Sequence, residues 1–226
     1  MPNLTPSGKQ LPSKYQQEFQ TWLSSAQQVN RKPKPYTSQI TRRTPSAFVF
    51  LLDQSGSMAE TILYKGKTRR KDDVLAECIN EMLNGLLDKC VRNGEIRDYV
   101  DICVIGYGGD SENTAKLCWQ GNLADKTFVK MNELSQHYLS KETISISTKG
   151  PGGLSRYIDK EIKTWFKPVA VKLTPMEDAL HLCHDLLVEW LYPYRNEDIF
   201  PPLVFNITDG QATNTTPEKL LKASQK

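Results

Sequence analysis

The stretch Ala47–Met58 reads AFVFLLDQSGSM and gives the clearest indication of the fold. Its first six residues are apolar, with aromatic and branched side chains, and the run stops at Asp53. A short apolar run of this kind is typical of a strand buried on both faces of a parallel sheet. The polar residues that follow then lie at the carboxyl end of the strand, where open α/β sheets bind their ligands.

Three oxygen-bearing side chains alternate after this strand, at Asp53, Ser55 and Ser57. In extended backbone alternate side chains share one side, and Gly56 allows a tight turn there. One carboxylate and two hydroxyls are hard ligands, suited to Mg²⁺, Mn²⁺ or Ca²⁺ rather than to zinc. The same pattern also describes a polar turn whose serines only cap a helix, so both interpretations stay open at this point.

The composition is ordinary for a globular protein, with 38% hydrophobic and 24% charged residues and a formal net charge of +3. At 226 residues, the chain is expected to form one sizeable domain plus an extension. Residues 1–45 hold seven basic residues and one acidic residue, whereas the remainder holds 22 basic and 25 acidic residues. The globular part therefore does not have the charge of a nucleic-acid binder. A short basic extension is more typical of a solvated linker.

The cysteines and the absence of long apolar runs indicate the compartment. We expect buried free thiols in a reducing compartment, because no C-x-x-C pattern occurs and several cysteines fall at apolar positions of predicted elements. They are Cys78, Cys90, Cys103, Cys118 and Cys183. The sequence shows no N-terminal apolar segment with a cleavage signal and no run of membrane-spanning length, so we expect a cytoplasmic protein without membrane contact.

Residues 1–45 are predicted to be a basic extension that carries one short helix. Residues 1–14 have a composition typical of disorder, and residues 30–46 read as a linker. Between them a capping box at Ser13–Gln16 precedes an amphipathic pattern. Its apolar face consists of Tyr15, Phe19, Trp22, Leu23 and Ala26. Such a helix can dock a partner or pack on its own domain, and we favour packing because isolated short helices are marginal.

Residues 46–226 are predicted to form the α/β domain. An amphipathic helix begins at Val74 and ends near Asn93-Gly94. Tyr99–Tyr107 reads as a second buried strand, and Lys116–Gln120 as a short edge strand. We interpret 125–171 as an insertion of mixed structure, with a helix around 127–139 and a strand at 142–148.

The last third of the chain repeats the pattern of helix and strand. Thr174-Pro175-Met176-Glu177 has the form of a capping box with proline at the first helical position. Pro202–Thr208 reads as a third buried strand, which ends in Asp209-Gly210. Thr216-Pro217 opens one more helix.

Five residues together resemble a known metal site. Asp53, Ser55 and Ser57 stand in Asp-Gln-Ser-Gly-Ser, Thr174 in Thr-Pro-Met-Glu-Asp-Ala-Leu and Asp209 in Thr-Asp-Gly. The set resembles the metal-ion-dependent adhesion site (MIDAS) of von Willebrand factor A (VWA) domains. The resemblance runs from about Ser46 to Lys226 and is interrupted by the insertion. It implies a doubly wound, mostly parallel, Rossmann-like sheet. The stretch before Asp209 is similar to bacterial intracellular members, including those grouped with tellurite resistance.

The resemblance also implies a mode of action. The three hydroxyls would bind the ion directly, and at least one aspartate would act through water. Such an ion keeps much of its positive charge, and Mg²⁺ completes six positions with waters. A partner's Asp or Glu can displace one of these waters. The resemblance therefore implies a metal-dependent protein–protein interaction module and no catalysis. Thr174 can also cap its helix at the same time.

Two other classes of function stay open. In one, Asp53 is the nucleophile of an aspartate-based phosphotransfer enzyme, although the related D-x-D-x-T pattern has an acid where this chain has Ser55. In the other, the metal is structural and the N-terminal helix binds the partner of a scaffold protein. His181 and His184 lie three residues apart and suggest a second metal, but an exposed polar helix face explains them better.

The resemblance further predicts an unusual sheet edge. VWA domains typically continue past the Thr-Asp-Gly strand, so we expect this sheet to lack its last strands. The strand 202–208 would then have no outer neighbour and no charges to protect it. We therefore expect either a truncated chain or completion of the sheet by another polypeptide.

Overall fold

The computed structural model describes residues 13–28, 38–109, 115–149, 155–210, 212 and 215–225. Its centre is a mostly parallel sheet in which β1 lies between β11 and β6, and both neighbours run parallel to it. Two short strands, β7 and β8, pair antiparallel with β6. The strands are β1 (Ser46–Asp53), β6 (Val100–Tyr107), β7 (Ala115–Leu117), β8 (Val129–Lys130) and β11 (Leu203–Ile207).

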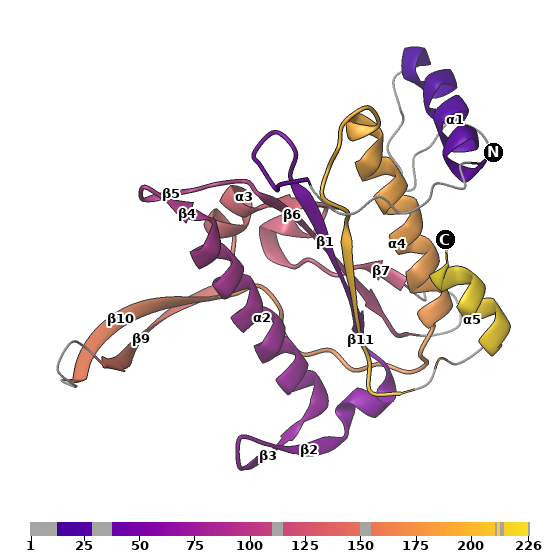
Figure 1. Ribbon diagram of the computed structural model, residues 1–226. Helices are drawn as coiled ribbons and strands as arrows, with labels where there is room; N and C mark the ends of the chain where they lie inside the picture. The colour runs from indigo at the N-terminus through magenta and orange to yellow at the C-terminus, as the bar shows by residue number, and fades with distance from the viewer. Residues whose placement is uncertain are drawn as a thin grey trace.

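Helices cover both faces of this sheet (Figure 1). On one face, α2 (Lys71–Cys90) and α3 (Met131–Gln136) pack on one set of alternating strand residues, which includes Phe50 and Ile102. On the other face, α4 (Met176–Leu191) and α5 (Pro217–Ser224) pack on the opposite set, which includes Leu51 and Cys103. The chain therefore has a mixed α/β fold, compatible with a Rossmann-like arrangement.

The two predicted central strands are confirmed. β6 is buried along its whole length, and β1 is buried except at Phe48. Both are covered by helices on each side, which is why their sequences are continuous apolar runs rather than alternating ones. The short strand β7 also lies where expected, at the edge of the sheet.

The prediction that 202–208 is a buried strand was wrong, whereas the expectation that it has no outer neighbour agrees with the described part of the sheet. β11 (Leu203–Ile207) ends the sheet, and within the described residues it pairs only with β1. Val204 is 43% exposed and Phe205 is 39% exposed. An apolar run reads the same on an edge strand as in a sheet interior, because hydrophobicity alone does not show how many neighbours a strand has.

Several predicted boundaries are corrected by two-residue hairpins. Asn93-Gly94 does not end α2, which stops at Cys90. Instead it forms the turn between β4 (Val91–Arg92) and β5 (Glu95–Ile96), with φ of 54° and 77°. Lys65-Gly66, with φ of 49° and 76°, joins β2 (Thr61–Tyr64) to β3 (Lys67–Arg70). Positive φ at both turn residues is the geometry of type I′ turns, which are common in two-residue hairpins.

The insertion at 125–171 contains β8, α3 and a long hairpin. The helix expected around 127–139 is limited to Met131–Gln136, because β8 takes the preceding residues to pair with β6. The expected strand is confirmed as β9 (Ser140–Lys149), and its partner is β10 (Ser155–Thr164). Figure 1 shows this hairpin projecting away from the central sheet.

Two buried asparagines of α2 hold the base of the β9–β10 hairpin. Asn84 bonds both the N–H and the carbonyl of Lys163, at 3.0 and 2.7 Å. Asn80 accepts the N–H of Trp165 at 2.8 Å and donates to the carbonyl of Phe166 at 2.9 Å. An amide side chain can satisfy a donor and an acceptor at once, so Asn80 and Asn84 satisfy backbone groups at the end of β10 and just after it.

The N-terminal helix packs on its own chain, as expected. α1 (Ser13–Gln28) buries Phe19, which is 5% exposed. The rings of Phe19 and Trp22 lie 5.0 and 5.5 Å from the ring of Tyr192, in the short helix η4 (Tyr192–Tyr194) that follows α4. The disorder prediction for residues 1–14 and the linker prediction for 30–46 lie largely outside the described residues, at 1–12 and 30–37. Of the rest, Ser13 and Lys14 belong to α1, 38–45 lie outside helices and strands, and Ser46 begins β1.

The remaining expectations have mixed outcomes. Four cysteines are buried, but Cys78 is exposed, and all five are free thiols. α4 begins at Met176 with Pro175 as its N-cap, so Thr174 is not the capping residue that the sequence suggested. Thr216 does cap α5. In the described part of the chain, no helix combines the length and the apolar character needed to cross a bilayer.

Candidate metal site

The carboxyl ends of β1 and β11 bring the first site residues together. Asp53 ends β1, and Thr208 and Asp209 follow β11 directly. The register pairs Leu52 with Ile207, so the next residues, Asp53 and Thr208, come opposite each other. Thr208 Oγ1 donates a hydrogen bond to Asp53 Oδ2 over 2.6 Å.

The two serines extend this contact to Asp209. The Ser55 N–H donates to Asp53 Oδ1 at 2.8 Å, the Ser55 and Ser57 hydroxyls lie 3.0 Å apart, and Ser57 donates to Asp209 Oδ1 at 2.9 Å. An ionised carboxylate only accepts, so Ser57 uses its single proton on Asp209 and Ser55 must donate to Ser57. Four of the five predicted site residues therefore form one hydrogen-bonded chain.

The chain of four runs from the interior to the surface. Asp53 is fully buried and Ser55 is 2% exposed, whereas the side chain of Asp209 is 17% exposed. Ser57 lies between Ser55 and Asp209 in this series of contacts, within the short helix η1 (Gly56–Ala59). The bend after Ser55 means that the serines meet through this helical turn, not through the continued extended backbone that the sequence suggested.

Thr174, the fifth predicted ligand, stands at the end of the strap 166–174, which links the β9–β10 hairpin to α4. Thr174 itself is 7% exposed. The N–H of Val171 donates to the carbonyl of Gln54 at 2.6 Å, and the N–H of Gly109 donates to the carbonyl of Lys172 at 2.8 Å. The strap is thus fixed to the loops that follow β1 and β6, and it contacts the first of them at Gln54, next to Ser55.

Two glycines make this close backbone approach possible. A Cβ at Gly108 would lie 2.5 Å from the carbonyl oxygen of Gln54, and one at Gly56 would lie 3.2 Å from that of Val171. Gly56 is not among the residues with positive φ, so its role here is space rather than the tight turn that we expected.

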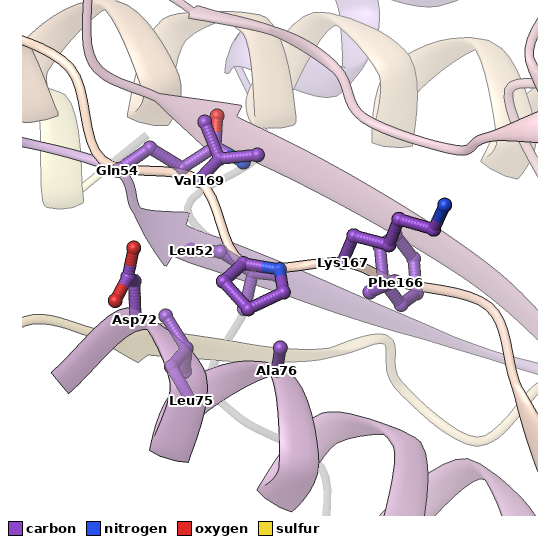
Figure 2. Close-up of a pocket in the computed structure, with 9 residues that line it drawn as sticks. Leu52, Gln54, Asp72, Leu75, Ala76, Phe166, Lys167 and Val169 are labelled. Carbon is purple, nitrogen blue, oxygen red and sulfur yellow. The ribbon is translucent and has the colours of Figure 1, made fainter. Parts of the chain in front are cut away.

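A small pocket lies beneath the strap (Figure 2). It is bounded by the end of β1, by the first turns of α2 at Asp72 and Ala76, and by the strap at Pro168. Its volume of about 20 Å³ is close to the space of one water molecule. None of the five predicted metal ligands lines it, and it is too small for an organic substrate.

Sequence reasoning missed three residues at this site: Thr208, Lys71 and Glu60. Lys71 donates to Asp209 Oδ2 at 2.5 Å and to Glu60 Oε2 at 2.7 Å. Thr208 was predictable, because it adjoins Asp209 at the end of a strand that pairs with β1. Lys71 stands in a basic stretch with no periodic signal, so only the hairpin β2–β3 explains how it returns to the site.

The charges around Asp209 favour its ionised form. Burial opposes the charged carboxylate, but the hydrogen bonds from Lys71 and Ser57 outweigh it, and the pKa of Asp209 is lowered. The same contact with Asp209, together with that from Glu60, raises the pKa of Lys71. Asp209 is therefore negative at neutral pH.

The donor set fits a hard divalent cation. It consists of two carboxylates and of hydroxyl groups, which are the ligands that Mg²⁺, Mn²⁺ and Ca²⁺ accept. Each carboxylate oxygen of Asp53 and Asp209 accepts a hydrogen bond and has a second lone pair that an ion can use. Over the described ranges, no group of three or more His, Cys, Asp and Glu side chains is placed to hold a metal. An ion bound between Asp53 and Asp209 would therefore need further oxygens, such as the hydroxyls of Ser55 and Ser57.

The two histidines of α4 have carboxylate neighbours of their own. His181 Nε2 lies 3.7 Å from Glu177 Oε1, and His184 Nδ1 lies 2.9 Å from Asp185 Oδ1. The side chains of both carboxylates are partly exposed. This arrangement is that of a polar helix face.

No model of a protein family matches the chain, and a search of curated proteins finds no match.

Proposed function

We propose that this chain is a metal-dependent protein–protein interaction module of the VWA type. The observation that carries the proposal is the hydrogen-bonded chain from Asp53 through Ser55 and Ser57 to Asp209, at the carboxyl edge of a mostly parallel sheet. Ser57 and Asp209 meet there although they lie 152 positions apart in the sequence. The order of the four residues along the sequence is that of the MIDAS pattern.

The residues of the candidate site would have different roles in holding the ion. Asp53 is buried and fixed by two donors, so it would set the position of the serines rather than meet the solvent. The hydroxyls of Ser55, Ser57 and Thr174 would supply neutral ligands, and Asp209 would supply a charge at the rim. A bound Mg²⁺, Mn²⁺ or Ca²⁺ would supply a positive centre with an exchangeable position. The partner is then a protein that presents Asp or Glu.

Two features favour this function over the alternatives. Asp53 is fully buried and both of its oxygens accept hydrogen bonds, which suits an orienting carboxylate better than a nucleophile for phosphotransfer. Phe19 and Trp22, on the apolar side of α1, pack against Tyr192 of the same chain. This contact leaves less apolar surface of α1 for a partner than a scaffold function would need.

The experiment is capture of an acidic partner in the presence and absence of a chelator. A suitable probe is a set of peptides that carry one Asp or Glu, each compared with its Asn or Gln counterpart by fluorescence polarisation in Mg²⁺ and in EDTA. Binding that requires both the acid and the ion supports the proposal. The double variant Ser55→Ala, Ser57→Ala should lose as much binding as EDTA removes. Binding that survives both treatments contradicts it.

A further inference from the structure

Lys71 places a positive charge on a carboxylate that belongs to the candidate metal site. Its ammonium group contacts Asp209 Oδ2 and Glu60 Oε2, at 2.5 and 2.7 Å. The side chains of Lys71 and Asp209 are only 19% and 17% exposed, whereas that of Glu60 is 68% exposed. The lysine thus sits between one sheltered and one open carboxylate.

The local structure does not otherwise favour a lysine at this position. Lys71 is the first residue of α2, where the helix dipole disfavours a positive charge and favours the acids Asp72 and Asp73 that follow. The contacts with Asp209 and Glu60 account for it instead. Its N–H also donates to the carbonyl of Glu60 at 2.9 Å, which closes the base of the β2–β3 hairpin and holds the ammonium group beside the site.

We propose that Lys71 is an internal competitor of the divalent ion: it neutralises Asp209 when no ion is bound and moves entirely to Glu60 when the ion binds. This inference rests on the proposed function. An ammonium group and a divalent cation repel each other at the same carboxylate, and little water screens them where both side chains are sheltered. Glu60 gives the displaced ammonium group a partner that lies outside the chain of site residues.

If Lys71 competes with the ion, its replacement should raise the affinity for the ion and lower the stability of the metal-free protein. Loss of the Lys71 charge removes a competitor, so the ion binds more tightly. The same loss leaves Asp209 without its cation in the metal-free protein, which lowers the stability of that form. If Lys71 had only a structural role, its replacement would lower stability without making ion binding tighter.

The test is titration of Mn²⁺ by calorimetry into the wild-type chain, Lys71→Met and the control Lys67→Met. Lys67 is an exposed residue of the same hairpin, so its replacement removes an equal charge away from Asp209. We expect the Kd of Lys71→Met to fall by about fivefold or more, the effect of one ion pair, and that of Lys67→Met to change by less than about twofold. In EDTA, the Tm of Lys71→Met should fall below that of the wild type.

A second variant guards against misfolding of the first. Glu60→Gln removes only an exposed carboxylate, and it should weaken Mn²⁺ binding because the displaced ammonium group has lost its alternative partner. In the Lys71→Met background, the same change should have a smaller effect. Equal effects in both backgrounds, or a Kd of Lys71→Met that is unchanged or higher, would overturn the competition while Mn²⁺ binding itself persists. Absence of Mn²⁺ binding in the wild type and in Lys71→Met alike would instead overturn the proposed function, and the competition with it.

Discussion

Thr208 donates its hydroxyl proton to Asp53 across the ends of β11 and β1, over 2.6 Å. Thr208 Oγ1 also lies 3.2 Å from both the N–H and the carbonyl oxygen of Gly210. One hydroxyl therefore joins the buried carboxylate of the site to the loop that carries Asp209. In the proposed metal site, Thr208 would fix the orientation of Asp53 without touching the ion.

Thr208→Val should weaken Mg²⁺ binding by about tenfold, because the valine keeps the shape of threonine but leaves Asp53 Oδ2 without its donor. Thr208→Ser should stay close to the wild type. Calorimetric titration of Mg²⁺ into the three proteins measures the effect. Equal affinities for the valine and serine variants would show that Thr208 does not orient Asp53.

Asp53→Asn and Asp209→Asn should each weaken Mg²⁺ binding by at least about tenfold, because each removes a negative charge from a site that otherwise consists of hydroxyls. Circular dichroism should show that the fold is kept. Asp178→Asn, an exposed change in the first turn of α4, serves as the matched control. Unchanged Mg²⁺ affinity in both site variants would contradict the site itself.

Asn80→Ala should lower the free energy of unfolding by about 3 kcal/mol, since it leaves buried backbone groups of Trp165 and Phe166 without partners. Urea unfolding followed by fluorescence measures this change. Asn122→Ala, at an exposed position, should cost less than about 0.5 kcal/mol. Comparable losses in the two variants would mean that the amide does not hold the hairpin base.

Asp72 should make the stability depend on pH. The bidentate hydrogen bonds from Arg70 lower the pKa of Asp72 although burial opposes them, and the side chain is 3% exposed. A folded-state pKa below the ordinary value contributes stability that is present above about pH 4, the unfolded pKa, and that is lost as the pH falls through the folded pKa. The stability deficit of Asp72→Asn should therefore be full at pH 7 and shrink below about pH 4. Urea unfolding at several pH values measures it, and a deficit that is constant down to pH 3 would rule out this linkage.

The exposed edge of β11 should drive self-association. Val204 is 43% exposed and lines an apolar groove of about 380 Å³ between α4, α5 and β11. Val204→Lys places a charge on this edge and should shift the chain toward monomer in sedimentation velocity. Leu63→Lys makes the same kind of change at a residue that is 78% exposed and lies outside the central sheet, and should have little effect. A wild-type chain that stays monomeric at all concentrations would contradict the prediction.

The sequence predicts the parts of the fold in which burial and local pattern agree. β1 and β6 are continuous apolar runs because both of their faces are covered, and Thr216 caps α5 because its side chain accepts a backbone N–H. Asp53 and Asp209 were predictable as neighbours because each stands at or just after the end of a strand, and these two strands pair. Ser55 and Ser57 join them as expected, but through the turn of η1 rather than through extended backbone.

The rest depends on contacts that no local pattern contains. The strand β10 has little apolar alternation, and it is held by its pairing with β9 and by Asn84. The exposure of β11 could not be read from its apolar sequence, because the number of neighbours of a strand is a property of the whole sheet. The expectation that it has no outer neighbour came from the family resemblance instead. Lys71 is brought to Asp209 by the turn at Lys65-Gly66, and a run of basic residues does not reveal such a return.

The placement of the thiols gives the native sequence a built-in labelling site. Cys78 is the exposed cysteine of the five, and its Sγ lies 3.6 Å from the Tyr64 hydroxyl. Burial raises the pKa of Cys118 and that of Cys183 to about 12, which keeps these thiols protonated and unreactive. A maleimide fluorophore will therefore attach at Cys78. That position lies on α2 about 10 Å along the helix axis from Lys71 and beside the β2–β3 hairpin. Fluorescence of a singly labelled protein can then follow ion binding in real time, without an engineered cysteine.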